Sequence, residues 1–85
     1  MIDYKKLEEG LDKLDGYALE AVEKEERLTG NAATELSLSK SFQARLAAKA
    51  LGMNVHDLKS LKLKEYNAVC ARVFSFLFAP EPATT

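Results

Sequence analysis

Cysteine and proline are scarce in this chain of 85 residues, and each scarcity has a consequence. The only cysteine, Cys70, has no partner for an intrachain disulfide and cannot build a zinc site alone. A single thiol suits a reducing compartment, so we expect a cytoplasmic protein. The two prolines, Pro80 and Pro82, stand close to the C-terminus, where they prevent a preceding helix from continuing.

Long apolar runs and an excess of charge of one sign are also missing. The opening residues, MIDYKKLEEG, lack the apolar segment of a signal peptide. The longest apolar stretch, residues 73–79, is too short to cross a bilayer, so we expect no membrane association. The 12 basic and 13 acidic side chains nearly cancel, which argues against a dedicated nucleic-acid binder.

The apolar residues recur at steps of three and four, which is the periodicity of amphipathic helices. The first stripe consists of Tyr4, Leu7, Leu11 and Leu14. Asp3 is its expected N-cap, whereas Gly10 weakens the predicted helix by about 1 kcal/mol relative to alanine.

A second helix is predicted from Tyr17 to Leu28, with Asp15 as its N-cap and Gly30 as its stop signal. Its apolar side consists of Ala18, Ala21, Val22 and Leu28. Its other side carries the charged run EKEER, residues 23–27, which we expect to face water. A loop of small and polar residues, 31–38, should follow.

The third helix begins after Ser37 or Ser39 and ends at Gly52, a residue suited to the left-handed conformation of a helix C′ position. Its apolar face consists of Phe42, Leu46, Ala47, Ala50 and Leu51. Asn54 then caps a short fourth helix that buries Leu58 and Leu61.

The last helix is predicted from Lys64 to Phe78. One seam on it consists of Tyr66, Val69, Cys70, Val73 and Leu77. No alternating strand pattern occurs anywhere. We therefore predict an all-α fold, a small bundle of four to five short helices, with residues 1–79 as a single domain and residues 80–85 as a disordered tail.

No residue pattern points to an enzyme, a cofactor or a metal ion. The only histidine, His56, falls at the start of a short helix beside Asp57, which is typical of a solvated residue in a first turn. Cys70 occupies the middle of an apolar seam, where cysteine usually behaves as a small hydrophobic residue. The sequence has neither a glycine-rich phosphate loop nor a metal-ligand spacing.

The stretch LAAKALGMNVHDLKSLK, residues 46–62, has the layout of a helix-turn-helix. Its second helix, however, is short and presents Asp57 among its polar residues, which suits phosphate poorly. A basic patch remains available from Lys40, Arg45, Lys49, Lys59, Lys62 and Lys64. A small DNA-binding regulator is therefore the alternative to a bundle in which these two helices simply pack together.

The run FSFLF, residues 74–78, contains more apolar surface than one helical face can hide, because successive residues turn by about 100°. Two outcomes are open. Either the first helix folds over the far side and covers these side chains, or part of the run stays exposed as a partner site.

Three segments resemble the small tail assembly chaperones of long-tailed bacteriophages and prophages. LDKLDGYALEAVEKEERLTG is similar to the opening of that family, an acidic turn that leads into a helix rich in Glu and Arg. SFQARLAAKALGMNVHDLKSL is similar to its central segment, and LKEYNAVCARVFSFLF to its closing helix. The resemblance covers residues 11–78, whereas residues 4–10 look like an added or extended helix.

The resemblance implies a protein that is not an enzyme and that acts in the cytoplasm of a bacterial host cell. Members of this family bind the tape measure protein, a long helical chain that sets tail length. They keep it soluble until tail tube subunits polymerise around it.

A long amphipathic client needs its apolar stripe covered, and an apolar helix of a small module can do this by helix-in-groove contact. The predicted partner-binding residues are Phe42, Leu46, Tyr66, Val69, Val73, Phe74, Leu77 and Phe78. The same surface could instead form a homo-oligomer by isologous packing. Any residue of this set that lies in the protein's own core would be structural.

Overall fold

The computed structural model of the protein describes residues 2–79, which form five α-helices and one 3₁₀ turn without any strand. The elements are α1 (Tyr4–Lys13), α2 (Gly16–Leu28), η1 (Leu36–Leu38), α3 (Lys40–Leu51), α4 (Val55–Lys59) and α5 (Leu63–Phe78). The predicted all-α bundle of short helices is confirmed. The tail predicted at 80–85 lies outside the described residues.

The helix boundaries follow the capping residues that local chemistry predicts. Asp3, Asp15, Ser39 and Asn54 each accept a backbone N–H bond at the start of their helices. Ser39 rather than Ser37 caps α3, because its hydroxyl accepts from the Phe42 N–H. Gly52 ends α3 with φ +69°, the left-handed geometry expected at a C′ position.

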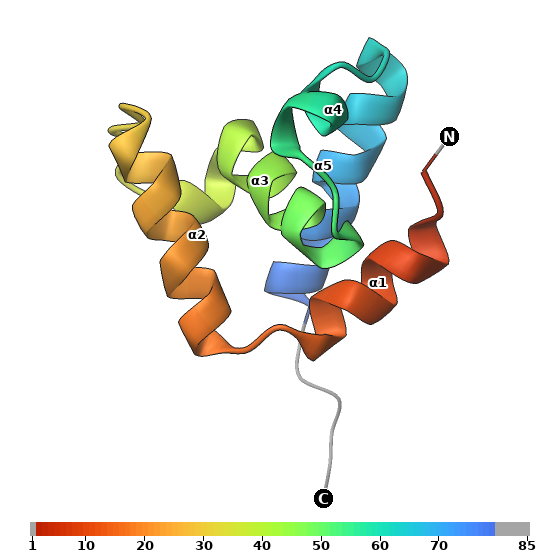
Figure 1. The fold of residues 1–85 in the computed structure, drawn as a ribbon, viewed down its shortest axis with the longest axis horizontal. Coiled ribbons are helices and arrows are strands. Elements are labelled where there is room, and N and C mark those ends of the chain that lie inside the picture. Colours follow the sequence, from red (N-terminus) through yellow and green to blue (C-terminus); the bar gives the residue numbers. More distant parts are fainter. Residues whose placement is uncertain (1, 80–85) are drawn as a thin grey trace, which may run out of the picture.

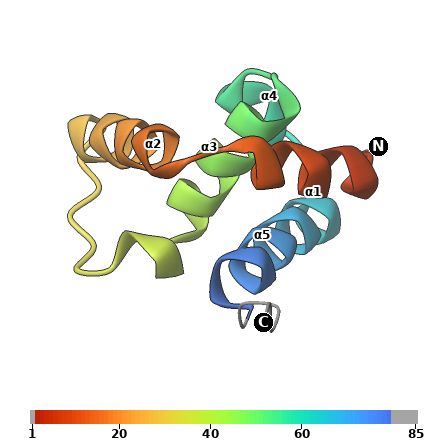
Figure 2. The same cartoon turned by 90° about the horizontal axis from the view of Figure 1, so that it is seen from below.

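Helix α3 occupies the centre of the bundle (Figure 1) and packs against the other four helices and η1. Seen from below, α2 lies on one side of α3, while α1 and α5 lie together on the other (Figure 2). This central position buries more of α3 than its predicted apolar face. The buried set includes Gln43, whose amide nitrogen donates to the Ser37 carbonyl at 2.7 Å.

Gly10 allows α1 to lie directly on α3. A Cβ at this position would stand 2.2 Å from the carbonyl oxygen of Ala50 and 2.8 Å from its carbon, which are backbone atoms of α3. The missing side chain is therefore what permits the close approach of the two helices. The helix-weakening glycine identified in the sequence has a packing function.

The seam between α2 and α3 contains a buried carboxylate. The EKEER run of α2 was expected to face water, but Glu26 is only 1% exposed, which corrects that prediction for this residue. Its Oε1 accepts from Arg45 Nε at 2.8 Å, and its Oε2 accepts from Asn31 Nδ2 at 2.7 Å. The same Asn31 amide donates to Ser39 Oγ at 3.0 Å, so the network joins α2, the following loop and α3.

The pKa of Glu26 reports the strength of this network. Burial alone raises the pKa, but hydrogen bonds from Arg45, Asn31 and Ser41, together with the charge of Arg45, outweigh it and lower the pKa from 4.5 to about 2. The folded protein thus holds Glu26 as an anion. Elsewhere on α2, Ala21 and Leu28 were expected on the apolar side but are exposed, which corrects the prediction for both.

Helix α5 buries the middle of its predicted seam, since Val69, Cys70 and Val73 belong to the core. Helix α1 covers one flank of α5 through Arg72. The Arg72 guanidinium lies 4.6 Å from the centre of the Tyr4 ring and 3.5 Å from Glu8 Oε2. The other flank of α5 faces η1 and the start of α3.

Candidate protein-binding surface

Four of the eight predicted partner-binding residues are core residues. Phe42, Leu46, Val69 and Val73 are each at most 3% exposed. The prediction is wrong for these four as exposed contact residues, because their side chains are already covered by other helices. They support the surface from beneath, where α3 and α5 meet.

Two further residues of the predicted set lie at the edge of the core. Leu77 is partly buried and packs against the core cluster. Tyr66 is also partly buried, and its hydroxyl lies 3.5 Å from the carbonyl oxygen of Lys40, to which it donates. Burial, and to a lesser degree the neighbouring Cys70, raises the pKa of the Tyr66 phenol. Tyr66 therefore fastens α5 to the start of α3.

Phe74 and Phe78 remain as the exposed members of the set, 42% and 51% exposed. They stand one turn apart on α5, and their ring centres lie 4.7 Å apart with the planes tilted by 38°. An aromatic pair of this kind presents a broad apolar contact with few rotatable bonds. Helix α1 does not cover them, because it packs on the opposite flank of α5 through Arg72.

Leu38 extends this apolar surface from η1. It is exposed, and it lines a hollow of about 500 Å³ together with Phe74 and Ala71 of α5. Lys40 and Asn67 border the same hollow and are hydrogen-bonded to each other at 2.8 Å. We name Leu38, Phe74 and Phe78 the aromatic patch. It has the apolar centre and polar border of a protein interface.

Sequence reasoning missed Leu38 and undervalued Phe76. Leu36 and Leu38 stand two residues apart in a polar loop, and the structure buries only Leu36. That spacing was the available signal, because a short turn cannot turn both side chains inward. Phe76 is 38% exposed on the flank of α5 opposite the aromatic patch, so all three phenylalanines of FSFLF retain exposed surface.

The candidate DNA-binding residues lie on or near a very short helix, and half of the cations among them are hydrogen-bonded within the protein. Helix α4 comprises only residues 55–59. Three of the six cations of the predicted basic patch bind within the protein, Arg45 to Glu26, Lys40 to Asn67 and Lys59 to Ser41. A recognition helix presents several side chains to base edges, and α4 has too few turns for that.

The candidate reactive groups are separate from one another. His56 is exposed on α4, and its backbone N–H serves the Asn54 cap. Cys70 is buried, its Sγ lies 3.5 Å from the Lys40 carbonyl oxygen, and burial raises the pKa of its thiol. Within residues 2–79, no three His, Cys, Asp or Glu side chains come together as ligands for a metal ion.

Comparison of the chain with protein-family models, with curated proteins and with solved structures finds no match. Across the described helices, none is long and apolar enough to cross a membrane.

Proposed function

We propose that this protein is a phage tail assembly chaperone, a helical module that binds the tape measure protein and keeps it soluble. The observation that carries the proposal is the aromatic patch. Phe74 and Phe78 expose their rings at the end of α5 although the protein has a filled core of its own. The choice of the tape measure protein as the client comes from the resemblance of residues 11–78 to that family.

The physical case begins with the cost of an exposed apolar patch. Soluble proteins rarely expose contiguous apolar patches larger than a few hundred Å² unless the patch binds something. Here the rings are held by a rigid helix whose opposite face, Val69 and Val73, is fixed in the core. A preformed patch loses little side-chain freedom on binding, which favours affinity.

The geometry suits a helical client. The tape measure protein is a long amphipathic chain, and its apolar stripe would aggregate if left uncovered. Aromatic rings one turn apart on α5, with Leu38 beside them, can pack against side chains spaced three and four residues apart on a client helix. The proposed role contains no catalytic step and belongs in the cytoplasm of a bacterial host.

Co-expression with a tape measure protein tests this function. We expect the client to be soluble, and to co-purify, only when this protein is present. Phe74→Asp and Phe78→Asp should abolish co-purification while leaving the helix content measured by circular dichroism unchanged. Leu63→Asp is the matched control, because Leu63 is an exposed apolar residue at the other end of the same helix.

Three results would refute the proposal: an insoluble client beside a soluble wild-type protein, equal co-purification by wild type and patch variants, or loss of binding by the Leu63→Asp control. Size-exclusion chromatography of the isolated protein tests the alternative that the patch forms a homo-oligomer. If the patch mediates self-association instead, wild type should elute as an oligomer and Phe74→Asp as a monomer.

A further inference from the structure

A second apolar surface lies on the opposite flank of α5 from the aromatic patch. It is a groove of about 210 Å³ between the end of α1, the start of α2 and the end of α5. Its apolar lining consists of Leu11, Leu14, Leu19, Leu46, Phe76 and Leu77. We name these residues the leucine groove. An apolar cavity of roughly 150 Å³ holds a benzene ring, so the groove has room for one large side chain.

Acidic residues border the leucine groove. Asp15 and Gly16 line the groove and also an adjoining hollow that contains Tyr17 and Glu20. On the other side, Phe76 lines both the groove and a hollow that contains Glu9 and Asp12. We name Glu9, Asp12, Asp15 and Glu20 the acidic rim.

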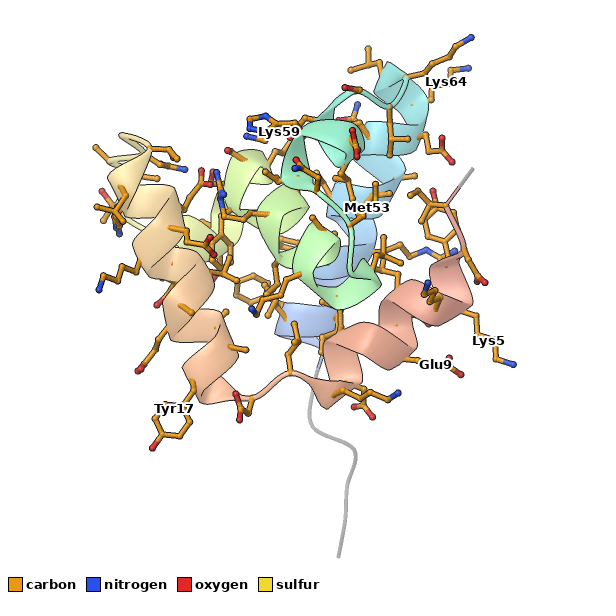
Figure 3. All side chains as sticks on the ribbon, in the orientation of Figure 1. Lys5, Glu9, Tyr17, Met53, Lys59 and Lys64 are labelled. Atoms are coloured by element: carbon orange, nitrogen blue, oxygen red, sulfur yellow. The ribbon has the colours of Figure 1, made fainter. Side chains whose placement is uncertain are left out.

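Basic residues border one part of this rim and not the other. Lys13 is the only basic residue in the segment 7–22. Arg72 lines the hollow that contains Glu9 and Asp12, where it also contacts Glu8 and the Tyr4 ring. Figure 3 shows that Lys59 and Lys64 lie at the end of the molecule opposite Tyr17. Lys5 lies beside Glu9 in the same view, whereas the hollow of Asp15, Tyr17 and Glu20 has no basic residue in its lining.

Tyr17 adds a second feature that suits a cation. Its side chain is 84% exposed and points away from the molecule at the start of α2 (Figure 3). It shares its hollow with Asp15 and Glu20. An exposed aromatic face between two carboxylates attracts a lysine or arginine by cation–π and ionic contact. One oxygen of Asp15 accepts from the Ala18 N–H at 2.9 Å, which leaves the second oxygen for a partner.

We propose that the leucine groove binds an amphipathic helix whose apolar side chain enters beside Phe76 and whose flanking residues are Lys or Arg, held by the acidic rim and Tyr17. The apolar lining supplies the anchor, and the charge of the rim selects the sign of the flanks. The proposal rests on the proposed function in one respect, since it takes the partner to be helical.

Model peptides of known charge test the inference directly. Three labelled helical peptides of about 18 residues carry one leucine stripe and differ only in their polar positions, which are lysine, glutamate or uncharged. Fluorescence anisotropy at low salt should give the lysine peptide the smallest Kd, by about tenfold over the glutamate peptide. The advantage should shrink as salt is raised, because exposed charges are screened.

Paired variants locate the contact. Asp15→Asn with Glu20→Gln removes two rim charges while asparagine retains the cap of α2. We expect it to weaken binding of the lysine peptide about fivefold and to leave the uncharged peptide unaffected. Glu25→Gln with Asp57→Asn changes the net charge equally at exposed sites away from the rim and should have no effect. Phe76→Ala should weaken binding of the lysine and uncharged peptides.

Several results would overturn the inference. These are equal affinity for the three peptides, preference for glutamate, equal effects of the rim and distal variants, or binding unaffected by Phe76→Ala. A rim-dependent dimer of the protein that leaves the lysine peptide unbound would assign the groove to a second copy and also overturn it. If the peptides fail these tests but the client is still solubilised, only the groove proposal is refuted. If the peptides bind as expected but the client is not solubilised, only the chaperone proposal is refuted.

Discussion

Helices α2 and α5 differ in how their composition relates to their burial. Helix α2 is rich in Glu, Lys and Arg, yet it buries the Glu26 carboxylate completely. Helix α5 is the most apolar helix, yet three of its phenyl rings stay partly in water. The difference shows that burial is decided by what lies opposite a side chain, and not by the polarity of the helix that carries it.

The neighbouring residues explain why Glu26 is buried and why Phe74 is exposed. Opposite Glu26 stand Arg45 and Asn31, which together satisfy both carboxylate oxygens. Phe74 shares an open hollow with Leu38, from a turn of three residues, and with Lys40 at the start of α3, which leave its ring 42% exposed. A buried charge is tolerated where it is fully paired, and a ring stays exposed where no neighbouring element is large enough to cover it.

Among the polar contacts, the largest effect on stability is expected from removal of the partner of Glu26. Arg45→Met leaves a buried carboxylate without its cation, so the free energy of unfolding should fall by about 3–5 kcal/mol in urea denaturation. Glu26→Leu combined with Arg45→Met should recover most of this loss, because the uncompensated charge is gone. Arg72→Met removes the exposed pair with Glu8 and should cost less than about 1 kcal/mol. Equal losses for Arg45→Met and Arg72→Met would contradict the comparison.

Acid should weaken the protein through the same carboxylate. Its pKa is lowered from 4.5 to about 2 in the folded state, so its contribution is complete above pH 4.5 and is lost as the pH falls toward 2. A shift of this size corresponds to about 3 kcal/mol. Urea midpoints measured across this pH range should fall steeply for wild type and less for Glu26→Gln. Parallel curves for the two proteins would refute the assignment.

Gly10 and Gly16 test whether contact, and not helix propensity, sets stability. Gly10→Ala should destabilise the protein by about 1–3 kcal/mol, because the new Cβ collides with the backbone of Ala50. Gly16→Ala should be neutral or slightly stabilising, because a Cβ there meets nothing within 4 Å. Thermal melts of the two variants measure both effects. A stabilising Gly10→Ala would mean that α1 does not lie against α3 as described.

A modest effect on stability is expected at the aromatic patch. Phe74→Asp should lower the free energy of unfolding by only about 1–2 kcal/mol, because its ring is 42% exposed and only part of it is packed. Val73→Asp, at the preceding residue, should unfold the protein because it places a charge in the core. Circular dichroism with urea titration measures the contrast. Unfolding of both variants would show that the Phe74 ring is part of the core.

The sequence predicted the helices well because their signals are local. Asp15 and Asn54 cap the helices that follow them, and Gly52 ends α3, all through contacts within a few residues. Burial of Glu26 could not be predicted in the same way, because Arg45 is 19 residues distant in the chain. The charged run EKEER looked solvated since nothing near it signals a buried partner.

The candidate site was predicted only in part for a related reason. The periodicity of α5 predicted a seam that contains Val73, with Phe74 beside it. It could not tell which flank of the helix another element would cover. That depends on where α1 and η1 come to lie, and both are determined by long-range packing. The exposed ends of FSFLF were therefore an open alternative until the structure placed α1 on the far flank.

The buried Cys70 thiol can report local opening of the protein, because its alkylation requires exposure of the sulfur. It is the only thiol in the chain, it is 1% exposed, and it lies where α5 meets the start of α3. Cys70 borders the hollow of Leu38 and Phe74 but is covered in the closed protein, so the rate of alkylation measures how often this part of the structure opens. A partner that binds the closed protein will slow alkylation, whereas a partner that displaces α5 from α3 will accelerate it.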